Sequence, residues 1–318
     1  MATRSVRWRG FQLQLTVPTR TGRSAEEQRA GAAPGAPGRL LFRDPPPQPH
    51  VRRRDVAAVT SFVDTAHEKL AEHRRAQTTR ADLAQRLTEV DWYHTIELPG
   101  GVVTPGQFDH RSLLPRYGLP ADLSGQRTLD VATFDGFWAF EMEKRGADVV
   151  AIDVETRADY DYPTPARSRL EDVRDLPPVG TGFALAHEAI GSTVERVAAS
   201  VYALDPALHG TFDLVHCGDL LLHLRDPLTA LERMRAVTRG QLLLSDVVDL
   251  EIGEGPWGPT TQYLGGWSDV VWWVPSLSAL AQMVVDAGFR DVRVNAVYSL
   301  AKTYETTGLW RASISASA

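Results

Sequence analysis

The sequence predicts an α/β fold built around a mostly parallel β-sheet. The clearest evidence is the stretch RTLDVATFDGFWAFEMEKRGADVVAID at residues 127–153. Thr128–Val131 and Val149–Ile152 are short apolar runs typical of buried strands. Between them lies a helical segment that ends at Gly146, where a helix terminus favours glycine. Two strands joined through a helix run parallel, so this stretch predicts one βαβ unit of a parallel sheet.

Polar residues follow both strands of this unit. A tight turn with Asp135 and Gly136 follows the first strand, and Asp153 ends the second. Ligands of parallel sheets bind at the carboxyl ends of the strands, and glycine lets a ligand approach the backbone. A carboxylate at Asp153 can accept both hydroxyls of a ribose, so the turn predicts a nucleoside-containing ligand. An ordinary βαβ turn with a solvated aspartate is the alternative, because ATFDGF lacks the GxGxxG pattern of dinucleotide sites.

Composition indicates a globular, cytoplasmic protein of 318 residues with 43% apolar residues and a mean hydropathy of −0.22. The sequence has no run of 18 apolar residues, and its N-terminus has no apolar signal-peptide region. Cys217 is the single cysteine, which excludes an internal disulfide and a multi-cysteine metal site. We therefore expect neither a membrane span nor secretion.

Charge is distributed unevenly. Residues 1–54 carry a net charge of +8 with 7 Pro and 5 Gly, whereas the rest of the chain carries −14. The first segment predicts a disordered basic leader, although Ser5–Val17 alternates like a strand. Because an acidic body repels a phosphate backbone, we expect no nucleic-acid partner.

Residues 55–106 predict a helical extension that precedes the sheet. Apolar residues recur at helical spacing over 55–70 and 83–90, and Thr79 can cap the second helix. An aromatic segment follows at 91–106, with a predicted hairpin around Pro99–Gly101. We expect this region to pack over the ligand side of the sheet; a structural extension or a dimer contact is the alternative, so homo-oligomerisation stays open.

The remaining chain predicts three more βα units and two final strands. Two loops stand out: an acidic loop at 155–178 that can act as a lid, and an aromatic loop at 251–274. The other predicted elements are, in order, a helix at 182–189, strands at 194–202 and 211–217, a helix at 227–237, a strand at 241–248, a helix at 275–287, and strands at 291–297 and 303–313.

Four stretches share one family resemblance: WYHTIELPGGVVTPG, LDVATFDGFWAFEMEKRGA, FDLVHCGDLLLHLRDPLTALERMRAVTRGQLLL and VVWWVPSLSAL. Over roughly residues 90–315 the chain resembles class I S-adenosylmethionine (SAM) methyltransferases. The branch includes tRNA wobble-uridine carboxymethyl transferases and related bacterial enzymes of secondary metabolism. The resemblance implies a Rossmann-like seven-stranded sheet over 107–318, with an antiparallel last strand. It differs at Ala132 and Phe134, where many members have glycine.

The resemblance also implies SAM as the cofactor and assigns residues to it. The implied contacts are Asp130, Ala132, Thr133, Asp135 and Gly136 at the methionine part, Asp153 and Val154 at the ribose, Ser200, Val201 and Tyr202 at the adenine, and Cys217 and Gly218 at the sulfonium. The carboxymethyl transferases have a Lys in place of His94, a Tyr in place of Leu222 and an Arg-rich stretch in place of Lys302–Thr306. Because a buried carboxylate without charge partners is costly, we expect ordinary SAM rather than carboxy-SAM.

Candidate catalytic residues lie at the predicted carboxyl ends of the strands. They are His223, Asp219, His94, Tyr93 and Glu171, with Asp246 behind them. His223 is either a general base or a structural histidine, and Asp219 is a candidate substrate contact. Asp219, His223 and Asp246 share no fixed spacing, so we expect no metal site. The aromatic residues that can line a substrate pocket are Trp92, Tyr93, Trp257, Tyr263, Trp267 and Trp272.

The sequence thus predicts a SAM-dependent methyltransferase acting on a small, apolar or aromatic metabolite. An Arg-rich composition with three lysines is typical of GC-rich bacteria, which are rich in secondary metabolism. A tRNA wobble-base modifier and a non-catalytic binding protein with a degenerate cofactor site are the two alternatives.

Overall fold

The computed structural model describes residues 2–8, 11–17, 80–167, 178–253, 255, 258–265 and 270–318. Outside this range lie the helix predicted at 55–70, the capping residue Thr79, and three predicted site residues, Glu171, Trp257 and Trp267. By backbone contacts the chain forms two compact units, Met1–His50 and Val51–Ala318. The predicted boundaries after residues 54 and 106 stay predictions.

The first unit contains an antiparallel pair of strands, β1 (Ala2–Trp8) and β2 (Phe11–Val17). The described residues of the alternating stretch Ser5–Val17 belong to this pair. The predicted disorder of the leader concerns residues that the structure mostly does not describe.

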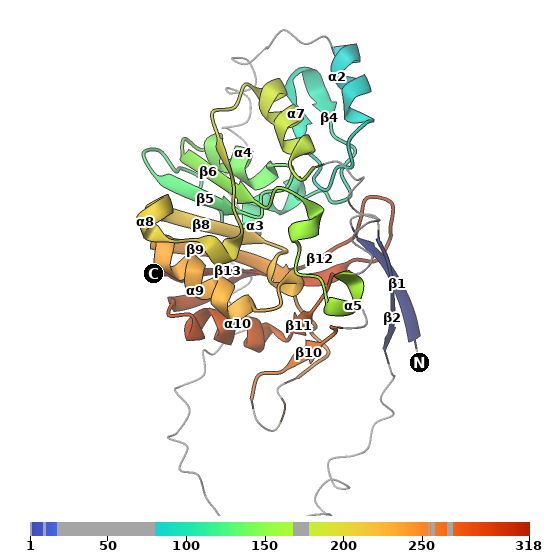
Figure 1. Cartoon of the computed structure of the whole chain (residues 1–318), viewed down its shortest axis with the longest axis vertical. Helices are drawn as coiled ribbons and strands as arrows, with labels where there is room; N and C mark the ends of the chain where they lie inside the picture. Colours follow the sequence, from blue (N-terminus) through green and yellow to red (C-terminus); the bar gives the residue numbers. More distant parts are fainter. Residues whose placement is uncertain are drawn as a thin grey trace, which may run out of the picture. The chain divides into compact units, whose positions relative to one another are not determined.

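The second unit is organised around a seven-stranded sheet with the order β12-β13-β9-β8-β5-β6-β7 (Figure 1). Its strands are β5 (Arg127–Val131), β6 (Asp148–Asp153), β7 (Glu195–Ala198), β8 (Phe212–Gly218), β9 (Thr238–Val247), β12 (Arg290–Leu300) and β13 (Leu309–Ser317). β5, β6, β7, β8 and β9 pair in parallel, whereas β13 runs antiparallel between β9 and β12. The predicted Rossmann-like sheet with its antiparallel last strand is confirmed.

Helices cover both faces of this sheet. The helices of the described residues are α2 (Arg80–Leu87), α3 (Leu114–Tyr117), α4 (Phe137–Glu143), α5 (Thr164–Arg167), α7 (Thr181–Ile190), α8 (Pro206–His209), α9 (Pro227–Val237) and α10 (Leu277–Asp286). Short 3₁₀ turns are η2 (Pro99–Gly101), η3 (Arg111–Leu113), η4 (Arg157–Asp159), η5 (Val201–Ala203) and η6 (Leu221–His223). The described residues also form two small antiparallel pairs: β3 (Glu97–Leu98) with β4 (Val102–Val103), and β10 (Thr261–Tyr263) with β11 (Trp273–Pro275).

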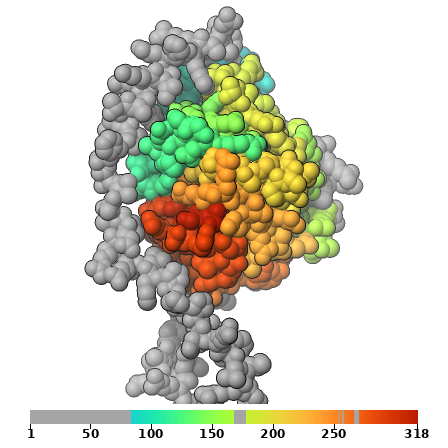
Figure 2. Space-filling model, turned by 90° about the vertical axis from the view of Figure 1, so that its left-hand side faces the viewer, coloured from blue at the N-terminus to red at the C-terminus, as the bar shows by residue number. Residues whose placement is uncertain are grey.

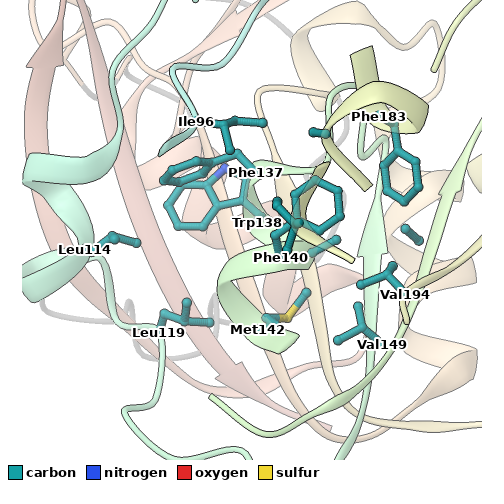
Figure 3. Close-up of a cluster of buried hydrophobic side chains, with 14 of the residues drawn as sticks. Ile96, Leu114, Leu119, Phe137, Trp138, Phe140, Met142, Val149, Phe183 and Val194 are labelled. Atoms are coloured by element: carbon teal, nitrogen blue, oxygen red, sulfur yellow. The ribbon is translucent and has the colours of Figure 1, made fainter. Parts of the chain in front are cut away.

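The apolar core has two parts, one on each face of the sheet. On one face, Phe137, Trp138 and Phe140 of α4 pack with Phe183 of α7 and Val149 of β6 (Figure 3). The other part includes buried residues of α9 and α10. In Figure 2, the successive segments coloured from green to red form one continuous surface. Two buried faces explain why the strands read as uninterrupted apolar runs.

Several element boundaries differ from the sequence prediction for identifiable reasons. The strand predicted at 194–202 ends at Ala198, because the Ser200 side chain accepts a hydrogen bond from Tyr202 N and begins η5. The last strand begins at Leu309 rather than 303, because Thr303 N donates to Gln107 O in a loop contact. The predicted hairpin around Pro99–Gly101 is confirmed by the β3–β4 pair.

Candidate functional site

The turn after β5 has an unusual backbone for its sequence. Ala132 and Phe134 have positive φ angles of 58° and 48°, and Gly136 has a φ of 89°. A residue other than glycine in this left-handed region is destabilised by roughly 1–2 kcal/mol. The turn therefore keeps a conformation that suits glycine even where the sequence has alanine and phenylalanine.

Asp153 lies at the carboxyl end of β6, beside this turn. Its Oδ2 accepts a hydrogen bond from Phe134 N at 2.9 Å, and its Oδ1 accepts one from Val154 N at 2.8 Å. The residue is only 6% exposed. Two backbone amides thus fix the carboxylate, and carboxylate oxygens have lone pairs for further donors.

Asp135 joins the turn to the segment that precedes the sheet. Its Oδ2 accepts hydrogen bonds from Tyr93 N at 2.6 Å and His94 N at 2.9 Å. A Cβ atom at Gly182 of α7 would lie 2.6 Å from Asp135 Oδ1, which explains the glycine there. His94 is buried, and its ring stacks on Phe137 with 5.7 Å between ring centroids. Asp135 thus links the turn after β5 to the backbone of Tyr93 and His94, and the His94 ring in turn packs on α4.

Asp130, on the strand before the turn, begins a buried chain of hydrogen bonds. His216 Nδ1 is 2.7 Å from Asp130 Oδ1, and His216 Nε2 is 2.9 Å from the Tyr117 hydroxyl. Within the described residues, Asp130 Oδ2 and Thr133 Oγ1 are buried and have no hydrogen-bond partner. Buried polar atoms of native proteins are nearly always paired. These two acceptors therefore fit a ligand that brings hydrogen-bond donors to the turn.

Tyr202 and Ser200 follow β7 at the same edge of the sheet. The Tyr202 hydroxyl donates to Asp161 Oδ2 at 2.7 Å and accepts from Asp226 N at 3.1 Å. Val201 is buried in the core part that includes α9 and α10. These contacts attach the loop that contains Asp161, part of the predicted lid, to the ends of β7 and η6.

The end of β8 presents backbone rather than a thiol. The Cys217 side chain is fully buried in the same core part as α9 and α10, and burial raises the pKa of its thiol well above the usual value. A Cβ atom at Gly218 would lie 3.3 Å from His216 Cε1 and 3.6 Å from Trp138 Nε1. Only the main chain of Cys217 is therefore available to a ligand.

A buried ion pair follows β8. Arg311 Nε donates to Asp219 Oδ1 at 3.0 Å and to Oδ2 at 2.8 Å, and the Tyr93 hydroxyl donates to Oδ2 at 2.9 Å. The Arg311 guanidinium also lies 5.0 Å from the Phe108 ring centroid. Burial by itself would raise the pKa of Asp219. The positive charge of Arg311 is the main opposing effect, and the opposing effects together hold this pKa below its usual value. The pair is thus ionised, and Tyr93 donates to it.

His110 is a second buried group in this region. It is 4% exposed, and within the described residues its Nδ1 has no hydrogen-bond partner. Its ring contacts Trp138 edge to face at 5.6 Å between centroids. Burial lowers the pKa of His110 to about 4, while Asp219 and Arg311 act on it in opposite directions. The imidazole is neutral at neutral pH.

His223 and Asp246 contact backbone groups. His223 Nδ1 lies 2.5 Å from Val270 O, and because a carbonyl only accepts, Nδ1 carries the proton. Asp246 accepts from Leu221 N at 2.6 Å and Val247 N at 2.7 Å. Burial, followed by the Asp219 charge, raises the pKa of Asp246 to about 8. Among the residues that the structure describes, no three His, Cys, Asp or Glu side chains form a possible metal site.

The aromatic residues predicted for a substrate pocket have different environments. Trp92 is 1% exposed, and its Nε1 donates to Leu87 O at 3.0 Å. Trp272 is buried, and its Nε1 donates to Asp161 O at 2.6 Å. Tyr263 is 58% exposed and packs against Trp273. A substrate role for these residues stays a prediction.

Sequence reasoning missed Arg311, His110 and His216. For Arg311 the sequence does contain a signal, which is the alternation of side chains in LWRASISAS. Ala312, Ile314 and Ala316 are buried in one core part, so Arg311 falls on the opposite face of the sheet. A buried arginine in a strand needs a charge partner. His110 and His216 carry no local pattern that separates them from ordinary core histidines.

The comparisons with known proteins agree with this geometry. A sequence profile of the methyltransferase-domain family matches residues 109–294, so the chain belongs to this family. No curated protein sequence matches it. The N-terminal domain of EvdMO1, solved with S-adenosylhomocysteine (SAH) and D-fucose present, has a similar structure: 19% identity, 76% of this chain and 98% of that chain covered, and a TM-score of 0.52.

Burkholderia thailandensis 1,6-didemethyltoxoflavin-N1-methyltransferase, solved with 1,6-didemethyltoxoflavin and SAH, shows 18% identity, with 61% of this chain and 71% of that chain covered and a TM-score of 0.42. Membership of the methyltransferase-domain family indicates SAM as the cofactor. Within the described ranges, no helix combines the length and apolar character needed to cross a membrane.

Proposed function

We propose that this chain transfers the methyl group of SAM to a small, neutral molecule bound beside the carboxyl end of β8. The observation that carries the proposal is the Asp153 carboxylate, which two backbone amides hold beside the turn after β5. A fixed acceptor at the carboxyl end of a parallel strand suits the hydroxyls of a ribose.

The residues of this edge fit SAM as follows. Asp153 accepts the ribose hydroxyls. Asp130 Oδ2 and Thr133 Oγ1, which are buried and have no hydrogen-bond partner among the described residues, accept from the ammonium of the methionine part. Val201 and Tyr202 flank the adenine, and the main chain of Cys217 and Gly218 lines the sulfonium side. The other predicted cofactor-binding residues contribute through their backbone or by holding the turns. They are Ala132, Asp135, Gly136, Val154 and Ser200.

Bound SAM supplies an electrophilic methyl group, and SAH remains after transfer. The protein then has to orient the acceptor and exclude water. Asp135 contributes by fixing the backbone of Tyr93 and His94 against the turn. A general base is needed only where the attacking atom is still protonated at neutral pH. Where such a base is needed, His223 stays the candidate, because its Nδ1 donates to Val270 O and Nε2 is then the basic nitrogen.

The described surroundings favour a polar acceptor. The aromatic loop of the sequence suggested an apolar or aromatic metabolite, but Trp257 and Trp267 lie outside the described residues. Near the end of β8, by contrast, Asp219, Arg311 and His110 are polar and buried. The EvdMO1 domain was solved with D-fucose present, which makes this sugar a suitable first probe.

The tRNA wobble-uridine branch is the second candidate function. It predicts a preference for carboxy-SAM and salt-sensitive RNA binding. The net charge of −14 outside residues 1–54 argues against it, because binding to nucleic acid depends on basic residues. A non-catalytic protein, the third candidate, predicts no affinity for any of these cofactors.

A thermal-shift titration with SAM, SAH and carboxy-SAM tests the proposal. At a hundred times its dissociation constant, a ligand adds about 2.7 kcal/mol of stability, which is readily measured. We expect stabilisation by SAM and SAH and less by carboxy-SAM. A preference for carboxy-SAM supports the tRNA candidate, and no shift with any of the three contradicts the enzyme proposal.

A further inference from the structure

Four buried polar residues lie near the end of β8, and we call them the acceptor cluster: Tyr93, His110, Asp219 and Arg311. Tyr93, Asp219 and Arg311 are joined by hydrogen bonds, and the charges of Asp219 and Arg311 act on His110. Asp219 follows β8, Arg311 lies on β13, and the other two precede the sheet. Each is less than a tenth exposed. Arg311 pairs in β13 with Val247 at the end of β9, so its side chain belongs to the same edge as Asp219.

The acceptor cluster is neutral as a whole. Asp219 and Arg311 cancel each other, and the pKa of His110, lowered by burial to about 4, leaves its ring uncharged at neutral pH. Within these four residues, an additional charge would have no opposite charge left to pair with. Because an unpaired buried charge is strongly disfavoured, the cluster disfavours anionic and cationic acceptors.

The cluster also has unused hydrogen-bonding capacity. Within the described residues, Arg311 donates through Nε to Asp219 and through Nη1 to Leu300 O and Leu309 O, which leaves Nη2 as a donor. His110 Nδ1 is buried without a partner among those residues. Asp219 is a carboxylate with lone pairs beyond those that Tyr93 and Arg311 occupy. Donors and acceptors therefore lie side by side.

We propose that the acceptor cluster binds the methyl acceptor, and that this acceptor is a neutral molecule bearing neighbouring hydroxyl groups. A hydroxyl both donates and accepts, so one hydroxyl can donate to Asp219 while the next accepts from Arg311 Nη2. The imidazole of His110 takes a third polar contact. This inference rests on the proposed methyltransferase function and specifies its substrate class.

Ligand-observed saturation-transfer NMR on the full-length protein tests the inference. The protein is first saturated with SAH, and binding of SAH is verified by calorimetry. Three probes are then compared: D-fucose, a neutral sugar; D-galacturonate, the related sugar with a carboxylate; and indole, an apolar aromatic ring. We expect D-fucose to bind at least about tenfold more tightly than D-galacturonate. Burying the unpaired carboxylate of D-galacturonate costs more free energy than a tenfold ratio in affinity represents.

Variants assign the binding to the cluster. Asp219→Asn and His110→Gln should each weaken D-fucose binding by about tenfold, the effect of losing one good hydrogen bond, and leave SAH binding intact. Asp213→Asn is the matched control, because Asp213 lies earlier in β8 and pairs with Arg239. Should Asp219→Asn fold poorly, Tyr93→Phe removes a single hydroxyl, and Asp219→Asn with Arg311→Gln keeps the region neutral.

The outcomes separate the two levels of the proposal. If SAH does not bind, the proposed function fails and the acceptor cluster loses its basis with it. If SAH binds but indole or D-galacturonate binds in preference to D-fucose, the proposed substrate class is overturned. Unchanged D-fucose binding in both cluster variants overturns the assignment of these residues.

Discussion

The cofactor end and the acceptor cluster are held by different kinds of contact. At the cofactor end, defined by the turn after β5 and by Asp153, carboxylates accept hydrogen bonds from backbone amides of Phe134, Tyr93 and His94. In the acceptor cluster, Asp219 is held by the side chains of Tyr93 and Arg311. One region is fixed mainly through the main chain and the other through side chains.

This difference has a consequence for tolerance to substitution. A site held by backbone amides keeps its shape when neighbouring side chains change, as Ala132 and Phe134 in a left-handed conformation illustrate. A site held by side chains from distant segments depends on each partner. We therefore expect the acceptor cluster to respond most strongly to single substitutions.

The largest expected effect is on Arg311→Met. It leaves the buried Asp219 carboxylate without its charge partner, and breaking such a pair costs about 3–5 kcal/mol of unfolding free energy. Urea denaturation monitored by circular dichroism measures this. The double variant Arg311→Met with Asp219→Asn should recover most of the loss. A single-variant cost below about 1 kcal/mol, the value of an exposed pair, would show that the pair is not buried in solution.

The next effect is a pH dependence caused by His110. Its pKa is about 4 in the folded protein, against 6.5 for an unperturbed histidine, so the unfolded chain binds more protons between these values. Stability should therefore be complete above pH 6.5 and fall as the pH drops toward 4, by an amount on the order of 3 kcal/mol. Urea midpoints of wild type and His110→Gln between pH 7 and 4.5 measure it. A variant with the same slope as wild type would contradict the assignment.

The smallest effect is expected at the cofactor end. Ala132→Gly relieves the left-handed conformation but gives the unfolded chain more freedom, so the net gain is about 0.5 kcal/mol. Ala139→Gly in α4 is the control, since the same change inside a helix destabilises by about 1 kcal/mol. Thermal denaturation of both variants measures the change in stability. Equal losses of stability in the two variants would mean that the backbone of Ala132 is not strained.

The sheet and the turn after β5 could be predicted because both depend on local sequence. Apolar runs such as Val149–Ile152 reveal buried strands, and the turn after β5 lies between two of them. Asp153 could be placed at the carboxyl edge of the sheet from its position at the end of a strand alone. The prediction needed no knowledge of side-chain packing.

Tyr93 and Asp219 were candidates from the sequence, but the acceptor cluster as a whole could not be predicted because its members are distant in sequence. Asp219 and Arg311 are 92 positions apart and meet only because β13 inserts beside β9. Local sequence favoured His223, which follows β8 closely, over His110, which precedes the sheet. The side-chain alternation along β8 would have been needed to see that the Cys217 side chain lies in the core. Only its main chain is then left at the carboxyl edge of the sheet.

Calorimetric titration of SAH into three proteins tests the central claim most directly: wild type, Asp153→Ala and Asp148→Ala. Asp148 is an exposed aspartate at the opposite end of the same strand, β6. We predict that Asp148→Ala binds SAH as wild type does, and that Asp153→Ala binds it about a hundredfold more weakly, as expected for lost hydrogen bonds to a charged group. Equal SAH affinity in wild type and Asp153→Ala would contradict a cofactor site at the end of β6.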